Sequence, residues 1–216
     1  DNGLFMPESI PILPDHFFKS LHKKSFQQIA FEVAQNLIGQ DISTSDLKRI
    51  VEQTVQCEAP LVEIDENIYS LELFHGPTFA FKDFGARFLS GLLGHFASLE
   101  NKEITILVAT SGDTGSAVAN GFLNVPGTKV IVLYPSGKVS AVQEKQFTTL
   151  GGNVQAIEVD GTFDDCQRMV KLCFLDEELK KIMLTSANSI NIARLIPQSF
   201  YYFNAFAQLI GEQEVI

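Results

Sequence analysis

The sequence predicts an α/β protein with a parallel-sheet, three-layer αβα fold and an N-terminal helical segment. Three near-continuous apolar runs have the composition of strands buried on both faces of a parallel sheet, namely Ile104–Val108, Val130–Leu133 and Val154–Val159. Segments with apolar residues at helical spacing separate these runs, and that alternation is typical of a sheet covered by helices. With 216 residues, of which 45% are hydrophobic, the chain is large enough to bury a sizeable core.

The first part of the chain predicts helices only. Apolar residues three and four apart indicate a short helix near residues 15–21 and a longer one over residues 26–38. A third helix follows Ser43 or Ser45, and its inward face consists of Leu47, Ile50, Val51 and Val55.

After Pro60 the pattern changes to strands. Residues 61–64 and 68–73 are strand-like, and the three polar residues between them suit a hairpin turn. Further helices are predicted over residues 84–96, 117–122, 142–150 and 163–174, followed by a last one over 191–209, in which Pro197 predicts a kink or a late start.

Composition excludes several classes of function. The chain has 16 basic and 26 acidic residues, a net charge of −10, and no basic stripe that would bind nucleic acid. Its apolar runs are shorter than the about 20 residues that span a bilayer, and no signal peptide is visible, so we expect a cytoplasmic protein without a membrane partner. The three cysteines lack paired spacing and the four histidines lack ligand spacing, so neither a disulfide framework nor a metal site is predicted.

Lys82 lies where a strand gives way to a helix, among Phe74, Phe79, Phe81 and Phe84. Burial disfavours an ammonium group and leaves a nucleophilic amine, which Schiff-base chemistry requires. Gly85 would let a flat ring approach the backbone. The alternative is a lysine in the first helical turn whose amine reaches water while its stem lies on the aromatic rings.

A glycine-rich turn over residues 109–116 joins a buried strand to a helix. Consecutive N–H groups at a helix N-terminus, with the hydroxyls of Ser111, Thr114 and Ser116, predict an anion site. Because Asp113 adds a negative charge, we expect the anion to be a carboxylate. The alternative is that Asp113 or Thr114 is an ordinary helix cap.

A third polar segment covers residues 186–194. Asn188 and Ser189 precede a helix start, and Arg194 lies about one turn further along. Two neutral donors, a helix dipole and a guanidinium group suit a phosphate. The alternative is a helix cap followed by a surface arginine.

Taken together and in this order, the segments resemble the pyridoxal-phosphate enzymes of the tryptophan synthase β-like fold (fold type II), and among them the threonine synthase family. Leu71–Phe84 is similar to that family's cofactor-lysine motif, and Thr110–Gly115 to its substrate-carboxylate loop. Gly3–Glu8 resembles its N-terminal region, and Ser186–Arg194 its substrate-phosphate segment.

This resemblance implies the conversion of O-phosphohomoserine and water to threonine and phosphate. It implies that Lys82 binds pyridoxal 5'-phosphate covalently, is displaced by the substrate amine and then moves protons at the α and β carbons. It assigns the substrate carboxylate to Ser111, Gly112, Asp113, Thr114 and Gly115, with Asp113 also near the ring hydroxyl of the cofactor. It assigns the substrate phosphate to Asn188, Ser189 and Arg194.

The resemblance also predicts a division into parts. Residues 1–57 would form the N-terminal helical segment, residues 58–94 and 186–216 part of the larger cofactor domain, and residues 95–185 a smaller α/β domain. The family's cofactor-phosphate loop follows a strand that would begin at Glu214, and the partner of the pyridine nitrogen comes later still. We therefore expect an N-terminal fragment that is weakly active or inactive.

Two other interpretations stay open. One is a phospho-lyase or β-eliminating deaminase of the same fold, and the other is a domain that folds without binding a cofactor. In either catalytic case the partner is a small-molecule substrate, and the protein is a monomer or a homodimer.

Overall fold

The computed structural model describes residues 6–187 and 191–212. The chain divides into two compact units. One contains Asp1–Phe88 and Ile190–Ile216, and the other contains Leu89–Ser189. The predicted division into residues 1–57, 58–94 with 186–216, and 95–185 stays a prediction.

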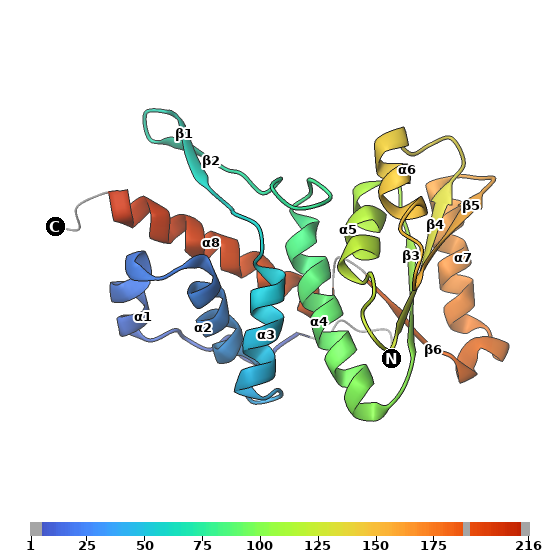
Figure 1. The fold of residues 1–216 in the computed structure, drawn as a ribbon, viewed down its shortest axis with the longest axis horizontal. Helices are drawn as coiled ribbons and strands as arrows, with labels where there is room; N and C mark the ends of the chain where they lie inside the picture. The colour runs from blue at the N-terminus through green and yellow to red at the C-terminus, as the bar shows by residue number, and fades with distance from the viewer. Residues whose placement is uncertain (1–5, 188–190, 213–216) are drawn as a thin grey trace. The chain divides into compact units, whose positions relative to one another are not determined.

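The first unit is mainly helical. Its helices are α1 (Asp15–Ser20), the 3-10 helix η1 (Leu21–Lys23), α2 (Phe26–Ile38), α3 (Thr44–Thr54) and α8 (Ile192–Glu212) (Figure 1). The predicted helices are confirmed, and Ser43 rather than Ser45 caps α3 by accepting a hydrogen bond from the Asp46 backbone N–H. Helix α2 packs against α8. Pro197 lies inside α8, so the start of this helix is not delayed.

The predicted hairpin is also confirmed. Strands β1 (Leu61–Asp65) and β2 (Ile68–Leu71) pair antiparallel, and Asn67 in the turn has a positive φ of 59°. Helix α4 (Lys82–Glu100) begins in the same unit. Phe88 on this helix packs edge-on against Phe200 of α8, with ring centroids 5.5 Å apart.

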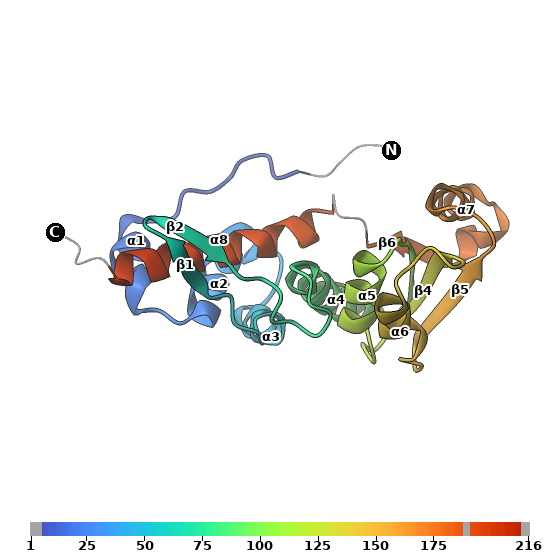
Figure 2. The same ribbon diagram turned by 90° about the horizontal axis from the view of Figure 1, so that it is seen from above.

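The second unit contains a four-stranded parallel sheet in the order β5-β4-β3-β6. The strands are β3 (Ile104–Ala109), β4 (Thr128–Pro135), β5 (Val154–Val159) and β6 (Met183–Ser186). Its other helices are α5 (Asp113–Gly121), α6 (Ala141–Thr148), α7 (Phe163–Leu175) and the 3-10 helix η2 (Glu178–Lys181). Figure 2 shows α5 and α6 on one face of the sheet and α7 on the other, which confirms the three-layer prediction.

Strand β6 was missed by the sequence prediction. It has four residues, none of them buried, and within residues 6–187 and 191–212 it pairs only with β3, at the edge of the sheet. A short edge strand carries no continuous apolar run, so its pattern gives little signal.

The strand order determines where a ligand can bind. The chain passes from β3 to β4 and β5 with α5 and α6 on one face, and then returns through α7 on the other face to β6. The boundary between β3 and β6 is therefore the point where the winding direction reverses. In open parallel sheets, ligands bind at the carboxyl ends of the strands at such a point.

Candidate functional site

Lys82 is the first residue of α4 and is half-buried. Its Nζ atom lies 5.7 Å from the centroid of the Phe81 ring. The structure thus places a primary amine at the start of a helix and beside one aromatic ring.

The predicted shield of four phenylalanines is wrong for three of them. Phe84 is 3% exposed and packs with Ala59 and Tyr201, but Phe74, Phe79 and Phe81 are 51%, 70% and 42% exposed. Strand β2 ends at Leu71, and the irregular segment between it and α4 has no regular face that could turn all these rings inward.

A buried carboxylate holds the segment before Lys82. Asp83 is 3% exposed, and its side chain accepts hydrogen bonds from the Thr78 backbone N–H at 3.0 Å and from the Thr78 hydroxyl at 2.5 Å. A Cβ atom on Gly76 would lie 2.3 Å from the Asp83 Oδ2 atom, so the backbone approaches this carboxylate as closely as only glycine allows. The residue pattern alone indicates no role for either Thr78 or Asp83.

The turn before α5 is organised by Thr110, which is 1% exposed. Its Oγ1 atom accepts hydrogen bonds from the backbone N–H groups of Gly112 at 3.0 Å and Gly115 at 2.8 Å. In this structure both of these N–H groups donate to the threonine side chain, and the binding of an anion by this turn stays a prediction. Gly112 has a φ of 152°, which favours glycine at this position.

The other predicted residues of this turn differ in exposure. Ser111 is exposed, and Asp113 and Thr114 in the first turn of α5 are half-buried. Ser116 is fully buried, and its hydroxyl lies 3.3 Å from both the Gly112 and the Gln143 carbonyl oxygens. Ser111 and Thr114 are thus better placed than Ser116 to meet a small molecule.

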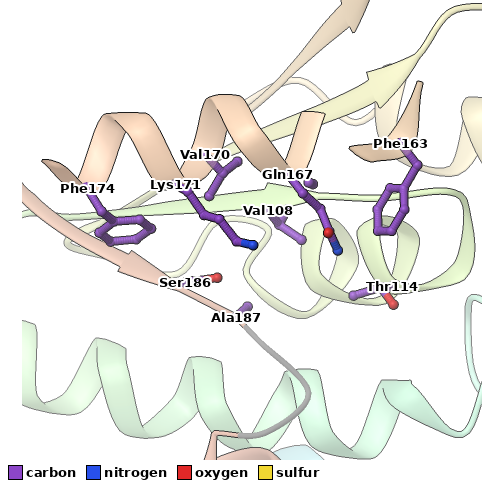
Figure 3. Close-up of a pocket in the computed structure, with 10 residues that line it drawn as sticks. Val108, Thr114, Phe163, Gln167, Val170, Lys171, Phe174, Ser186 and Ala187 are labelled. Carbon is purple, nitrogen blue, oxygen red and sulfur yellow. The ribbon is translucent and has the colours of Figure 1, made fainter. Parts of the chain in front are cut away.

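A pocket of about 470 Å³ lies at the carboxyl ends of β3 and β6, where the winding of the sheet reverses (Figure 3). Thr114 and Ser186 line it, and both belong to segments that the sequence predicts to bind anions. Helix α7 supplies further lining residues that were missed, among them Gln167, whose amide extends toward Thr114, and Lys171, whose amine extends toward Ser186. The i, i+4 spacing of Gln167 and Lys171 places them on one face of the helix, and this spacing could have indicated from the sequence that they line one site together. Two hydroxyls, an amide and an ammonium group can together bind a small anion.

Arg194 is 2% exposed and lies in the first turns of α8, so it is not a surface arginine. A Cβ atom on Gly85 would lie 3.1 Å from the Arg194 carbonyl oxygen and 3.5 Å from its Nε atom. At Gly85 the structure thus brings the backbone of α4 against Arg194, and the first residues of α4 and Arg194 both belong to the first unit. The approach of a flat ring at Gly85 stays a prediction. Asn188 and Ser189 lie outside the described residues, as do the strand start at residues 213–216 and part of the Gly3–Glu8 segment.

Cys166 is a packing group. It is fully buried in a cluster with Leu107, Leu133 and Val170, and burial raises the pKa of its thiol, which disfavours the nucleophilic thiolate. Burial likewise raises the pKa of Tyr201 beside Phe84.

Among residues 6–187 and 191–212, no group of three potential metal ligands is present. None of the helices within these ranges has the length and apolar character needed to cross a membrane.

Comparison with known proteins extends these findings. Residues 1–55 match the family described as "Threonine synthase N terminus", and residues 50–204 match the family described as "Pyridoxal-phosphate dependent enzyme". The chain is 47% identical to threonine synthase of Escherichia coli (strain K12) over 213 residues, which are 98% of this chain and 49% of that protein.

Solved structures give the same picture. The crystal structure of Escherichia coli threonine synthase superposes with a TM-score of 0.86 at 46% identity, covering 96% of this chain and 48% of that one. The structure of threonine synthase with bound pyridoxal phosphate from Brucella melitensis superposes with a TM-score of 0.91 at 37% identity, covering 99% and 48%. The chain spans about half the length of the curated relatives it matches. Because the match over residues 50–204 includes more than half of the chain, the protein belongs to the family of pyridoxal-phosphate-dependent enzymes.

Proposed function

We propose that the chain serves a threonine synthase reaction, in which O-phosphohomoserine and water become threonine and phosphate with pyridoxal phosphate as cofactor. The observation that carries the proposal is Lys82, a half-buried lysine at the start of α4 within the matched residues 50–204. Similarity to threonine synthases over nearly the whole chain supports the choice of reaction. The reaction belongs to amino-acid biosynthesis, and we propose the cytoplasm as its location.

The residues around Lys82 suit the cofactor. An aldehyde needs a primary amine that is partly shielded from water and held in one place, and Lys82 follows a segment fixed by a buried carboxylate. When bound, pyridoxal phosphate supplies the electron sink that stabilises negative charge at carbon atoms near the substrate amine. The protein supplies position and electrostatics.

We assign one role to each group of residues. The Lys82 amine binds the cofactor aldehyde and, once displaced by the substrate amine, moves protons at the substrate's α and β carbons. Residues 111–115 hold the substrate carboxylate through the donors that Thr110 does not occupy, with Asp113 near the ring hydroxyl of the cofactor. Thr114 shares its pocket with Gln167 and Lys171, which add an amide and a positive charge.

Asn188, Ser189 and Arg194 hold the substrate phosphate, which leaves from the γ carbon before water adds at the β carbon. Hydrogen-bond donors to the phosphate stabilise it most as negative charge develops on it during departure. The same phosphate-binding residues would suit a carbon–oxygen lyase that acts on other phosphorylated amino acids. The reaction is therefore identified by its products.

Covalent capture of the cofactor tests the proposal. The purified chain is incubated with pyridoxal phosphate, reduced with borohydride and mapped by mass spectrometry. We expect the modification at Lys82 and its loss in Lys82→Ala. Lys24→Ala is the matched control, because Lys24 also lies over a phenylalanine ring, with its Nζ 4.8 Å from the centroid of Phe17, and lies outside residues 50–204.

Product analysis with O-phosphohomoserine then separates the reactions. Equal amounts of threonine and phosphate support a threonine synthase, whereas 2-oxobutyrate with phosphate supports a phospho-lyase. Modification spread over many lysines, unchanged in Lys82→Ala, would contradict the assignment of Lys82.

A further inference from the structure

We propose that Thr78 and Asp83 form a positioning pair that fixes the Lys82 amine for reaction with an aldehyde. The inference rests on the proposed function, since it concerns how the cofactor lysine is held. Neither residue needs to touch cofactor or substrate.

The pair closes a short loop around the lysine. Thr78 lies before Lys82 and Asp83 directly after it, and the Asp83 side chain accepts two hydrogen bonds from Thr78, one from the backbone and one from the hydroxyl. The Asp83 backbone N–H in turn donates to the Ala80 carbonyl oxygen at 3.0 Å. Residues 78–83 are thus tied together at both the side-chain and the backbone level, and the Cα atom of Lys82 has little freedom.

Burial makes this pair a strong constraint. Thr78 is 6% and Asp83 3% exposed, so water cannot replace the bonds if the loop opens. A buried carboxylate without partners is costly, and opening the pair would leave Asp83 in that state. Its place in the first turn of α4 also lets the helix dipole favour its negative charge.

The backbone of the loop is strained, which indicates that the loop is held by its surroundings. Phe79 has a φ of 59°, in the left-handed region that non-glycine residues rarely occupy, while its side chain is 70% exposed. Packing of the Phe79 ring therefore does not account for this conformation. The Phe79 N–H donates to the Gly76 carbonyl oxygen at 3.1 Å, and Gly76 lies against the Asp83 carboxylate. Strain of this kind is maintained where the surrounding structure enforces it, often next to reactive groups.

The chain offers a matched control. In the cap of α7, Asp165 accepts hydrogen bonds from the Thr162 backbone N–H at 2.8 Å and from the Thr162 hydroxyl at 2.7 Å, which are the same donors as in the first pair. In this second pair Thr162 is exposed and Asp165 half-buried, and no lysine lies between them. Removing the hydroxyl breaks the hydroxyl–carboxylate bond in each pair, and at Thr162 it also removes the acceptor of the Asp165 backbone N–H. Only the first of the two pairs brackets Lys82.

The experiment measures the rate of pyridoxal phosphate capture at Lys82 in the unloaded chain, by borohydride reduction and mass spectrometry over a series of pH values. Thr78→Val removes the hydroxyl and keeps the shape of the side chain, and Thr78→Ser restores the hydroxyl. We expect the plateau rate at high pH to fall about tenfold in Thr78→Val, corresponding to about 1.4 kcal/mol in activation free energy. Thr78→Ser and Thr162→Val should react at close to the wild-type rate.

The outcomes distinguish failure of the positioning role of Thr78 and Asp83 from failure of the proposed function of Lys82. If Thr78→Val unfolds at a lower temperature but captures the cofactor at the wild-type rate, the pair is only structural and the inference is wrong, while Lys82 keeps its proposed role. If the wild-type chain shows no capture at Lys82, the proposed function fails and the inference fails with it. If Thr78→Val does not fold, Asp83→Asn takes its place, because it keeps the shape and one acceptor oxygen, and the same tenfold loss is expected.

Discussion

The turns that precede α4 and α5 use the same residue types in opposite ways. Each contains glycine and a buried threonine, and each leads into a helix. Before α5, the Thr110 hydroxyl oxygen accepts two backbone N–H groups of its own turn. Before α4, Thr78 donates twice to the buried carboxylate of Asp83.

This difference has a functional consequence. An N–H group that donates to a threonine within its own turn is no longer directed at a ligand, so a glycine-rich turn at a helix start does not by itself make an anion site. In the turn before α4, the buried Asp83 carboxylate is bonded to Thr78, and the adjacent Lys82 amine is the group proposed to react. The turn before α5 thus depends on a neutral acceptor, and the turn before α4 depends on a charge.

The largest effect is expected from Thr110→Val. It leaves the buried N–H groups of Gly112 and Gly115 without their acceptor, and because each unsatisfied buried group costs about 1–3 kcal/mol, the free energy of unfolding should fall by about 2–6 kcal/mol. Thr110→Ser keeps the hydroxyl and should lose about 1 kcal/mol for the methyl group. Denaturant unfolding monitors both variants, and equal stability of Thr110→Val and Thr110→Ser would mean that the hydroxyl does not hold this turn.

A smaller loss is expected from Gly76→Ala, which tests the turn before α4. The new methyl group would lie 2.3 Å from Asp83 Oδ2 in a buried site, so overpacking should lower the free energy of unfolding by about 1–3 kcal/mol. Gly161→Ala is the matched control, because its Cβ atom would lie 2.9 Å from the Oδ2 atom of Asp165, which belongs to the less buried pair formed with Thr162. There the carboxylate can move into water, and a loss as large as that of Gly76→Ala would contradict the role of burial.

The smallest effect, and one of opposite sign, is expected from Phe79→Asn. Among residues 6–187 and 191–212, the other non-glycine residues with positive φ are Asn67, Asn101 and Asn124, in keeping with the tolerance of asparagine for this conformation. Relief of strain at an exposed ring should raise the free energy of unfolding by up to about 1 kcal/mol. Phe81→Asn, at a position without positive φ, should bring no gain in the same denaturant measurement, and an equal gain in both variants would show that the φ of residue 79 is not strained.

Much of the fold could be predicted because most of its helices and strands carry a pattern of apolar residues that is visible within the element itself. The apolar runs of β3, β4 and β5 and the helical spacing of α2, α3 and α7 reflect burial within a few residues of sequence. Strand β6 could not be predicted in this way, because four partly exposed residues become a strand only through pairing with β3. The same strand completes one wall of the pocket lined by Thr114 and Ser186, so the place of the pocket followed from pairing as well.

For the candidate site, too, the sequence predicted the chemistry of single residues but not their surroundings. The sequence singled out Lys82, the turn at residues 111–115 and Arg194 from the chemistry of their side chains. It did not indicate that Arg194 is buried, that three of the four phenylalanines near Lys82 are exposed, or that Gln167 and Lys171 reach the pocket.

By itself, then, the sequence determined the order of helices and strands and which residues have the chemistry to react. The tertiary structure alone decided which strand lies beside β3, which hydroxyl accepts the glycine N–H groups and which carboxylate closes the loop around Lys82. Periodicity records whether a residue is buried within its own element, whereas the partner that satisfies a buried polar group is chosen by packing between segments.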